Sequence, residues 1–141
     1  MPKLKLTLDY EIADVGRAMD ALRDFCERLG SPAKPLHHFL LAIEEIVANA
    51  IHHGHPGPNA RPIEIKASVD HDALRCEIVD AGIPFDPVAR QSPPNVAGSI
   101  EDLCVGGLGI HITRTLMDAF TYERREGCNH TVLVKWLKRR D

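Results

Sequence analysis

Residues 42–54 read AIEEIVANAIHHG and form the second half of a helix that the sequence predicts over about residues 35–53. Apolar side chains in this stretch recur every three or four positions, so they lie on one side of a helix that turns by about 100° per residue. They are Leu36, Phe39, Leu40, Ile43, Ile46, Val47, Ala50 and Ile51. The pattern predicts an amphipathic helix, and GHPGPNARP at residues 54–62 ends it.

The segments on either side of this helix carry strand and helix patterns in a regular order. Apolar and polar residues alternate in residues 3–9, 62–69 and 73–80, as they do in strands with one buried face. Helical periodicity marks residues 11–29 before the central helix and about 108–119 after it. The sequence FTYERRE at 120–126 and TVLVKWLK at 131–138 predict the last two strands.

This order of elements predicts an α+β fold for one domain that spans residues 1–141. Strands that are neighbours in sequence and joined by short connections pair antiparallel, and helices then cover one face of the sheet. We therefore expect a two-layer α/β sandwich with a mixed, mostly antiparallel sheet and three helices on one face. Residues of about 86–105 are rich in proline and lack periodicity, which is typical of a functional lid.

Composition excludes several classes of protein. The chain has 141 residues, of which 44% are hydrophobic and 26% charged, as in ordinary globular domains. A net charge of -3 without a basic stripe argues against broad nucleic-acid binding. No apolar run is long enough for a membrane span or a leader, so we expect a cytoplasmic protein. The four cysteines form no CxxC pair, which argues against a zinc-binding site. We expect them to be reduced thiols.

Glu45 and Asn49 are the first candidate site residues. At a spacing of i,i+4 they lie on one side of the central helix, nearly opposite Ile43 and Val47. An Asn side chain can offer a neutral oxygen to a hard cation, and a Glu beside it can orient or deprotonate a nucleophile. The alternative is that both side chains are merely solvated on a polar helix face.

A second candidate is DAGIPFDP at residues 80–87, which begins where an alternating strand ends. The Asp80 carboxylate can accept a hydrogen bond from an exocyclic amine, and Gly82 lets a flat ring approach the backbone. Asp-x-Gly is also one of the commonest turn sequences and needs no ligand to explain it.

The third candidate is GGLG at residues 106–109, where the last helix is expected to begin. Glycines before a helix expose backbone N–H groups, and these make an anion site with the positive end of the helix dipole. A flexible hinge at the end of a long loop explains the same glycines equally well.

These three boxes, in this order and with a proline-bearing lid between the last two, resemble the Bergerat-fold ATPases, which include gyrase B and the histidine kinases. The sequences AIEEIVANAIHHG, DAGIPFDP and GGLGIHITRTLMD are most similar to those of the anti-sigma regulatory factors, which are serine/threonine protein kinases. The resemblance covers about residues 5–138. P-loop and eukaryotic-type kinase signatures are absent from the sequence.

The resemblance implies a role for each matching position. Glu45 would be the general base that acts on a substrate serine, and Asn49 would hold the Mg2+ that bridges the phosphates of ATP. Asp80 would bind the adenine amino group and Gly82 would lie against the ring. The other matching positions are His53 after the first box, Gly106, Gly107 and Gly109 around the phosphates, and Thr131, which would help to bind adenine through water.

The resemblance also implies partners. It predicts transfer of the γ-phosphate of ATP to a serine of an anti-anti-sigma antagonist protein, binding of a sigma factor, and a homodimer formed through residues 3–29. One departure is Pro84, which replaces the second glycine of the family's Asp box and removes a backbone N–H. We expect this proline to stiffen the loop.

Two other functions compete with the kinase. The same fold could serve as an inactive nucleotide-dependent binding module, although the presence of both Glu45 and Asn49 favours a kinase. The chain has eight histidines, and some of them could instead form a zinc or iron site with Glu45 and Asn49. No HExxH spacing supports such a site, and its candidate ligands are His37, His38, His52, His53 and His55.

Overall fold

The structure, a computed structural model, describes residues 1–53, 61–87 and 107–137. The strands are β1 (Lys3–Leu8), β2 (Ile63–Val69), β3 (Ala73–Asp80), β4 (Ala119–Arg125) and β5 (Cys128–Trp136). The helices are α1 (Ile12–Arg28), α2 (Ala33–His53) and α4 (Gly107–Leu116). This order confirms the order of elements that the sequence predicts.

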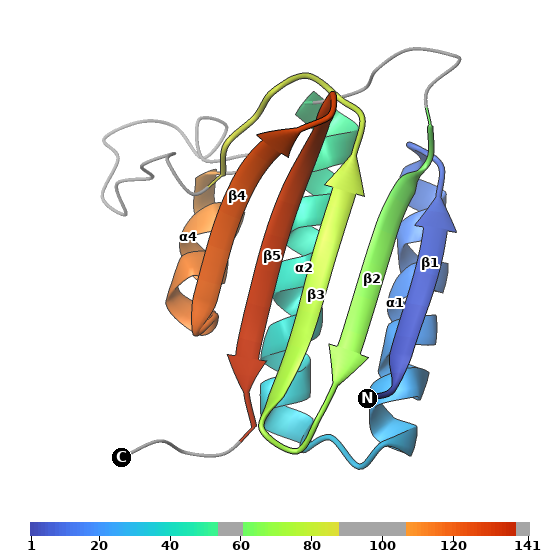
Figure 1. Cartoon of the computed structure of the whole chain (residues 1–141), viewed down its shortest axis with the longest axis vertical. Coiled ribbons are helices and arrows are strands. Elements are labelled where there is room, and N and C mark those ends of the chain that lie inside the picture. Colours follow the sequence, from blue (N-terminus) through green and yellow to red (C-terminus); the bar gives the residue numbers. More distant parts are fainter. Residues whose placement is uncertain (54–60, 88–106, 138–141) are drawn as a thin grey trace.

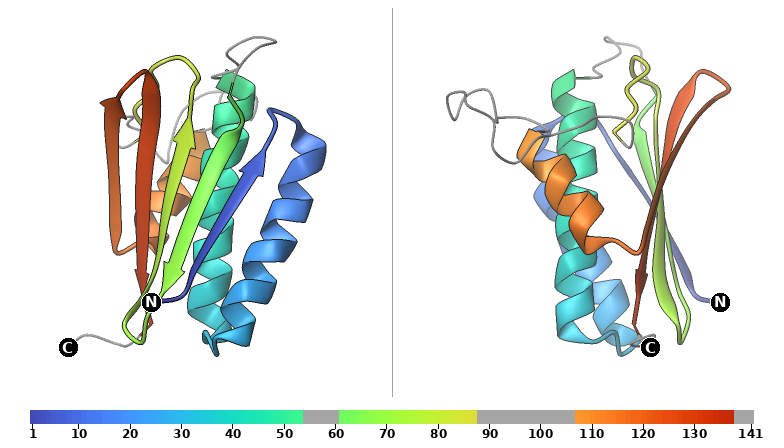
Figure 2. Two further views of the ribbon diagram at one scale, coloured as in Figure 1. Left: turned by 45° about the vertical axis from the view of Figure 1, so that its right-hand side comes forward. Right: turned by 90° about the vertical axis from the view of Figure 1, so that its left-hand side faces the viewer.

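The chain folds into two layers. The five strands form one sheet in the order β1-β2-β3-β5-β4 (Figure 1). The right-hand view of Figure 2 shows all three helices on the same side of this sheet. The predicted α+β sandwich is therefore confirmed. The sheet was expected to be mixed, but all four strand pairs among the described residues are antiparallel, because each pair is joined without a parallel crossover.

The core lies between the sheet and α2. Phe39, Ile43 and Val47 have no solvent-accessible surface, and they come from the predicted apolar side of this helix. The inner sheet face meets them with fully buried side chains such as Ile65 and Leu133. Burial of this apolar surface is the main force that holds α2 to the sheet. It also fixes the rotation of α2, and hence the direction of its other side.

The hairpin between β4 and β5 decides where the last strand begins. Glu126 and Gly127 have φ values of 54° and 75°, and such a two-residue turn with positive φ at both positions matches the twist of a hairpin. Strand β5 therefore starts at Cys128, three residues before the predicted start, and pairs at once with Arg125. The earlier start brings Asn129 opposite Asp80 on β3.

Several expectations fall outside the described residues. Among them are most of the predicted lid, from residue 88 to 105, and Gly106 and His55. Within residues 1–53, 61–87 and 107–137, Cys26, Cys76 and Cys128 are free thiols, which agrees with the expected reduced state. In the same part of the chain, no helix combines the length and the apolar character that a membrane crossing requires.

Candidate functional site

A recess opens between α2 and the end of the sheet where β3 stops. Its walls combine apolar side chains with a few polar groups, as the walls of small-molecule sites do. Helix α2 contributes Ile46, Asn49 and Ala50, the segment after β3 contributes Ile83, Phe85 and Pro87, and the strands contribute Asp80, Asn129 and Thr131.

Asp80 is the last residue of β3 and is only 7% exposed. Its Oδ1 atom accepts hydrogen bonds from the backbone N–H of Gly82 (3.0 Å) and from Nδ2 of Asn129 (2.9 Å). The first bond shows that the Asp-x-Gly turn is present, but the same carboxylate also lines the recess. The two interpretations of this box are thus compatible.

Burial raises the pKa of Asp80 above its ordinary value. The hydrogen bonds from Asn129 and Gly82 and the charge of Arg124 act in the opposite direction, because they favour the ionised form. The result is a poorly hydrated carboxylate that is held by donors on one oxygen. Such a group is a strong acceptor for a ligand N–H in the recess.

Asn49 lies on α2 and is 3% exposed. Its Nδ2 atom is buried and has no hydrogen-bond partner in the part of the chain that the structure describes. The alternative of a solvated Asn49 is therefore wrong, because the sheet and the segment after β3 cover this side of the helix. A buried amide without a partner costs free energy, and this cost points to a ligand that completes its hydrogen bonds.

Glu45 lies one helical turn before Asn49 and is half-buried. Its pKa is raised, first by burial and then by the negative charge of the neighbouring Glu44. Its carboxylate lies against Gly109 in the first turn of α4, where a Cβ atom would come within 2.6 Å of the Glu45 Cδ atom. An alanine at position 109 would therefore require the Glu45 carboxylate to move.

The glycines of the third box do not all precede the last helix, because two of them lie within it. Gly107 is the first residue of α4 and Gly109 lies in its first turn, whereas Gly106 is outside the described residues. The first N–H groups of any helix have no partner within the helix, so this end of α4 can receive an anion. The contact between Gly109 and Glu45 is not apparent from the motif alone.

His53 contacts the segment after β3, and Thr131 lines the recess together with Asp80. The ring of His53, at the end of α2, stacks on Phe85 with 5.2 Å between the centroids and 7° between the planes. Thr131 is 3% exposed on β5 and lines the recess. Among the described residues, no group of three His, Cys, Asp or Glu side chains is placed to hold a metal ion. The proposed histidine metal site therefore has no support there.

Sequence reasoning missed three polar side chains that support this site. Asn129 of β5 bonds to Asp80, and Tyr122 and Arg124 of β4 bond to Asn129. The sequence contains one signal for Asn129. It precedes Thr131 by two residues, so the two side chains share one face of the strand. The register that aligns them with Asp80 is not local and could not be predicted from this spacing.

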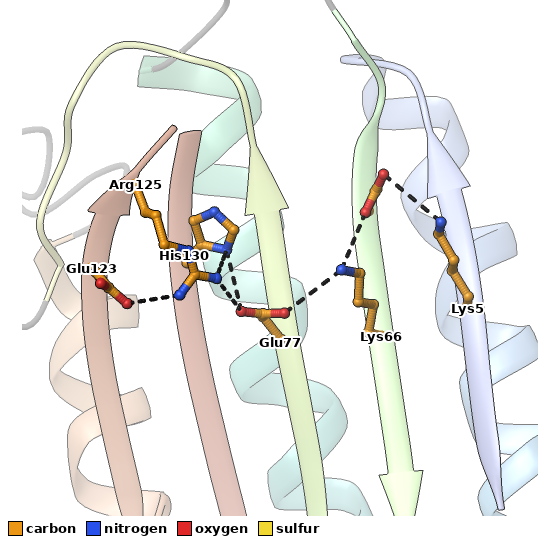
Figure 3. A network of polar contacts seen from close by, with 7 residues as sticks. Lys5, Lys66, Glu77, Glu123, Arg125 and His130 are labelled. Atoms are coloured by element: carbon orange, nitrogen blue, oxygen red, sulfur yellow. Dashed lines mark hydrogen bonds and ion pairs between the residues drawn. The ribbon is translucent and has the colours of Figure 1, made fainter. Parts of the chain in front are cut away.

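The opposite face of the sheet carries a separate network of charges (Figure 3). Glu77 is its centre: it forms ion pairs with Lys66 (3.8 Å) and Arg125 (3.7 Å) and a hydrogen bond with the His130 ring (3.2 Å). Exposed pairs of this kind contribute little to stability. The network shows that His130 points away from the recess, whereas its neighbour Asn129 lines it.

Gly109→Ala tests the contact with Glu45. If Glu45 is the general base that the resemblance implies, phosphoryl transfer should fall by about 10-fold, since displacement of a catalytic group by about 1 Å has effects of this order or larger. The measurement is the rate of transfer at saturating ATP. Gly16→Ala in α1 is the matched control, because nothing lies within 4 Å of its added Cβ. The control should gain about 0.5–1 kcal/mol of stability without loss of rate. Equal rates in both variants would contradict a catalytic position for Glu45.

Known proteins are similar to this chain over most of its length. Residues 8–135 match the family described as "Histidine kinase-like ATPase domain". The serine/threonine-protein kinase BtrW of Bordetella bronchiseptica is 35% identical over 93 residues, which cover 66% of this chain and 62% of that relative. The serine-protein kinase RsbW of Listeria monocytogenes is 26% identical over 137 residues, or 95% of this chain and 85% of the relative.

A solved structure has the same fold. The crystal structure of the RsbU and RsbW domains of Rv1364c from Mycobacterium tuberculosis aligns with 99% of this chain at a TM-score of 0.72 and 20% identity. This chain covers 34% of the length of that protein. At such low identity the likeness concerns the fold, which is the two-layer arrangement of Figure 2.

Proposed function

This chain belongs to the family of histidine kinase-like ATPase domains, and on that premise we propose that it is an ATP-dependent serine/threonine protein kinase that acts as an anti-sigma regulatory factor. Relatives that bear the names of serine kinases support the activity. The observation that carries the proposal is the pairing of a half-buried Glu45 with a buried, unpartnered Asn49 one turn later, within the described residues.

Phosphoryl transfer requires little covalent chemistry from the protein itself. A serine hydroxyl oxygen bonds to the γ-phosphorus of ATP, the bond from that phosphorus to the β,γ-bridging oxygen breaks, and ADP leaves. The serine proton passes to the Glu45 carboxylate. Transfer is therefore accelerated mainly by placing the hydroxyl beside this carboxylate and in line with the phosphate.

Asn49 could offer its amide oxygen to a hard cation, while its buried Nδ2 atom, which has no partner among the described residues, could donate to an acceptor such as a phosphate oxygen. An amide oxygen is a suitable ligand for Mg2+, which also binds substrate phosphates. When bound, Mg2+ would neutralise charge on the phosphates of ATP. Gly107 and Gly109 in the first turn of α4, with Gly106 before them in the sequence, would supply backbone N–H groups to the same phosphates.

The base of the nucleotide would occupy the recess. Asp80 would accept a hydrogen bond from the adenine amino group, Gly82 would lie against the ring, and Thr131 would bind the base through water. His53 would complete this end of the site through its stack on Phe85. The apolar walls suit a planar aromatic ring.

Two experiments test the proposal. Calorimetric titration of ATP into the purified protein, with and without Mg2+, should show binding that Mg2+ strengthens. Incubation with radiolabelled ATP, Mg2+ and a purified anti-anti-sigma antagonist protein should then yield phosphoserine, identified by mass spectrometry. Absence of ATP binding would overturn the whole proposal. Binding without transfer to any antagonist protein would favour the alternative, an inactive nucleotide-dependent binding module.

The partners follow from the same proposal. The substrate would be an anti-anti-sigma antagonist protein, and the kinase would also bind a sigma factor. Family resemblance supports a homodimer formed through β1 and α1. Strand β1 is at the edge of the sheet, where its outer backbone groups are open to a partner within the described structure.

The raised pKa of Glu45 predicts a pH dependence. A protonated carboxyl cannot accept the serine proton, so the transfer rate should fall as the pH drops through the pKa of Glu45, at a higher pH than for an ordinary glutamate. Glu44→Gln removes the neighbouring charge and should shift this acidic limb to lower pH. The measurement is a pH profile of the single-turnover rate. An unshifted limb in the variant would show that another group controls it.

A further inference from the structure

Three polar residues form a row across the inner face of the sheet, at the end that holds the recess. Asp80 on β3 lies opposite Asn129 on β5, and Asn129 lies opposite Arg124 on β4. Residues directly opposite each other share one face of a sheet, and Asp80 and Asn129 line the recess together with residues of α2, so all three side chains lie on the helix side. The row links the edge strand β4 to the recess.

Asn129 is the centre of this row and is 3% exposed. Its Nδ2 atom donates to Oδ1 of Asp80 (2.9 Å) and to the carbonyl oxygen of Ile83 (2.8 Å). Its Oδ1 atom accepts from the Tyr122 hydroxyl, from Arg124 (3.1 Å) and, more weakly, from the backbone N–H of Phe85 (3.4 Å). One side chain thus holds both the carboxylate and the segment that follows it.

The orientation of the Asn129 amide follows from its partners. A guanidinium can only donate hydrogen bonds, so the atom that faces Arg124 must be the amide oxygen. The nitrogen must then face Asp80, where it donates to the carboxylate. Within the described residues, both side-chain hydrogen bonds of Asp80 end on Oδ1, and Oδ2 is left for a ligand.

We propose that Asn129 is a positioning residue for nucleotide binding: it aims Oδ2 of Asp80 into the recess and holds residues 81–87 as the wall on which the base rests. Tyr122 and Arg124 orient the Asn129 amide, and Arg124 also donates to the carbonyl oxygen of Gly82 (2.7 Å). The inference rests on the proposed function, because it takes ATP as the ligand.

Charged and titratable groups around Asp80 come from each neighbouring element. Strand β4 provides Arg124, strand β5 provides His130 on the outer face, and the segment after β1 provides Tyr10. The pKa of Tyr10 is raised to about 12 by burial and by Asp80, so its hydroxyl stays neutral at ordinary pH. On α2, the recess-lining residue Asn49 is uncharged.

The test is Asn129→Asp, which keeps the size of the side chain and removes its donor. At alkaline pH the introduced carboxylate and that of Asp80 repel each other as ionised groups, so we expect ATP to bind about 10- to 100-fold more weakly than to the wild type. At lower pH the two carboxyl groups can share one proton, which restores a hydrogen bond between positions 129 and 80. Affinity should therefore recover toward wild type as the pH is lowered.

The readout is the ratio of the ATP dissociation constants of variant and wild type, measured by calorimetry between pH 5.5 and 8. Protonation of the ATP phosphates is common to both proteins and cancels in this ratio. Val132→Thr, on the outer side of the same strand, is the control and should give a ratio near 1 at every pH. A pH-independent ratio for Asn129→Asp would overturn the inference.

A second variant keeps the inference testable if Asn129→Asp does not fold. Tyr122→Phe removes one donor that orients the amide and should weaken ATP binding by about 3- to 10-fold, in the range of one lost hydrogen bond. Thr121→Ala, exposed on the same strand, is its control. Unchanged ATP affinity in Tyr122→Phe would overturn the inference. Failure of the wild type to bind ATP would instead overturn the proposed function.

Discussion

The Glu45→Gln protein is expected to bind ATP almost as tightly as the wild type and to transfer phosphate at least about 100-fold more slowly, the usual range for loss of a general base. Glutamine keeps the volume of the side chain, so the packing against Gly109 persists. It cannot accept the serine proton. The measurement is the single-turnover rate with an anti-anti-sigma antagonist protein, together with the calorimetric affinity for ATP.

The design separates chemistry from binding. A loss of transfer at unchanged ATP affinity is the signature of an interaction made only in the transition state. Glu44→Gln, one residue earlier and exposed, is the matched control and should keep its rate at neutral pH. If Glu45→Gln transfers phosphate as fast as the wild type, Glu45 is not the base.

The Asp80→Asn protein is expected to bind ATP about 100-fold more weakly than the wild type. The substitution places an amide donor against a donor of the ligand, and both groups are then buried without a hydrogen bond. Gly82 and Asn129 donate to one oxygen of Asp80, so the amide oxygen would take that position. The amide nitrogen would then face the recess and meet the adenine amino group. Calorimetry with ATP measures the effect.

Thermal unfolding distinguishes this loss from a damaged fold. Burial raises the pKa of Asp80 in the folded protein, so folding disfavours its ionised form. The free energy of unfolding therefore falls as the pH rises from the pKa of Asp80 in the unfolded chain to its pKa in the folded protein. Removing that charge should leave the melting temperature at pH 7 unchanged or higher. Asp20→Asn, highly exposed on α1, should change neither property. Unchanged ATP affinity in Asp80→Asn would remove Asp80 from the site.

Both variants follow from residues that the sequence already singles out, since local patterns carry that information. Glu45 and Asn49 share a helix side because of their spacing, and Asp80 ends a strand because the alternation stops there. The order of helices and strands is predictable for the same reason. Each of these inferences depends only on residues within a few positions of one another.

Tertiary structure decides what the local pattern leaves open. By spacing, Asn49 belongs to a polar helix side, yet packing against the sheet and the segment after β3 buries it. Gly109 belongs to a glycine-rich box, yet the approach of α4 to α2 makes it the surface on which Glu45 lies. Neither fact can be predicted from one segment, because each depends on where a second element packs.

By itself, the sequence determined the order of the elements, the two-layer fold and the candidate site residues, because periodicity and spacing are local properties of the chain. Only the tertiary structure placed Asn129 beside Asp80, 49 residues away. That contact depends on the register of β3 against β5. A shift of one residue would turn Asn129 to the opposite face, since side chains alternate along a strand.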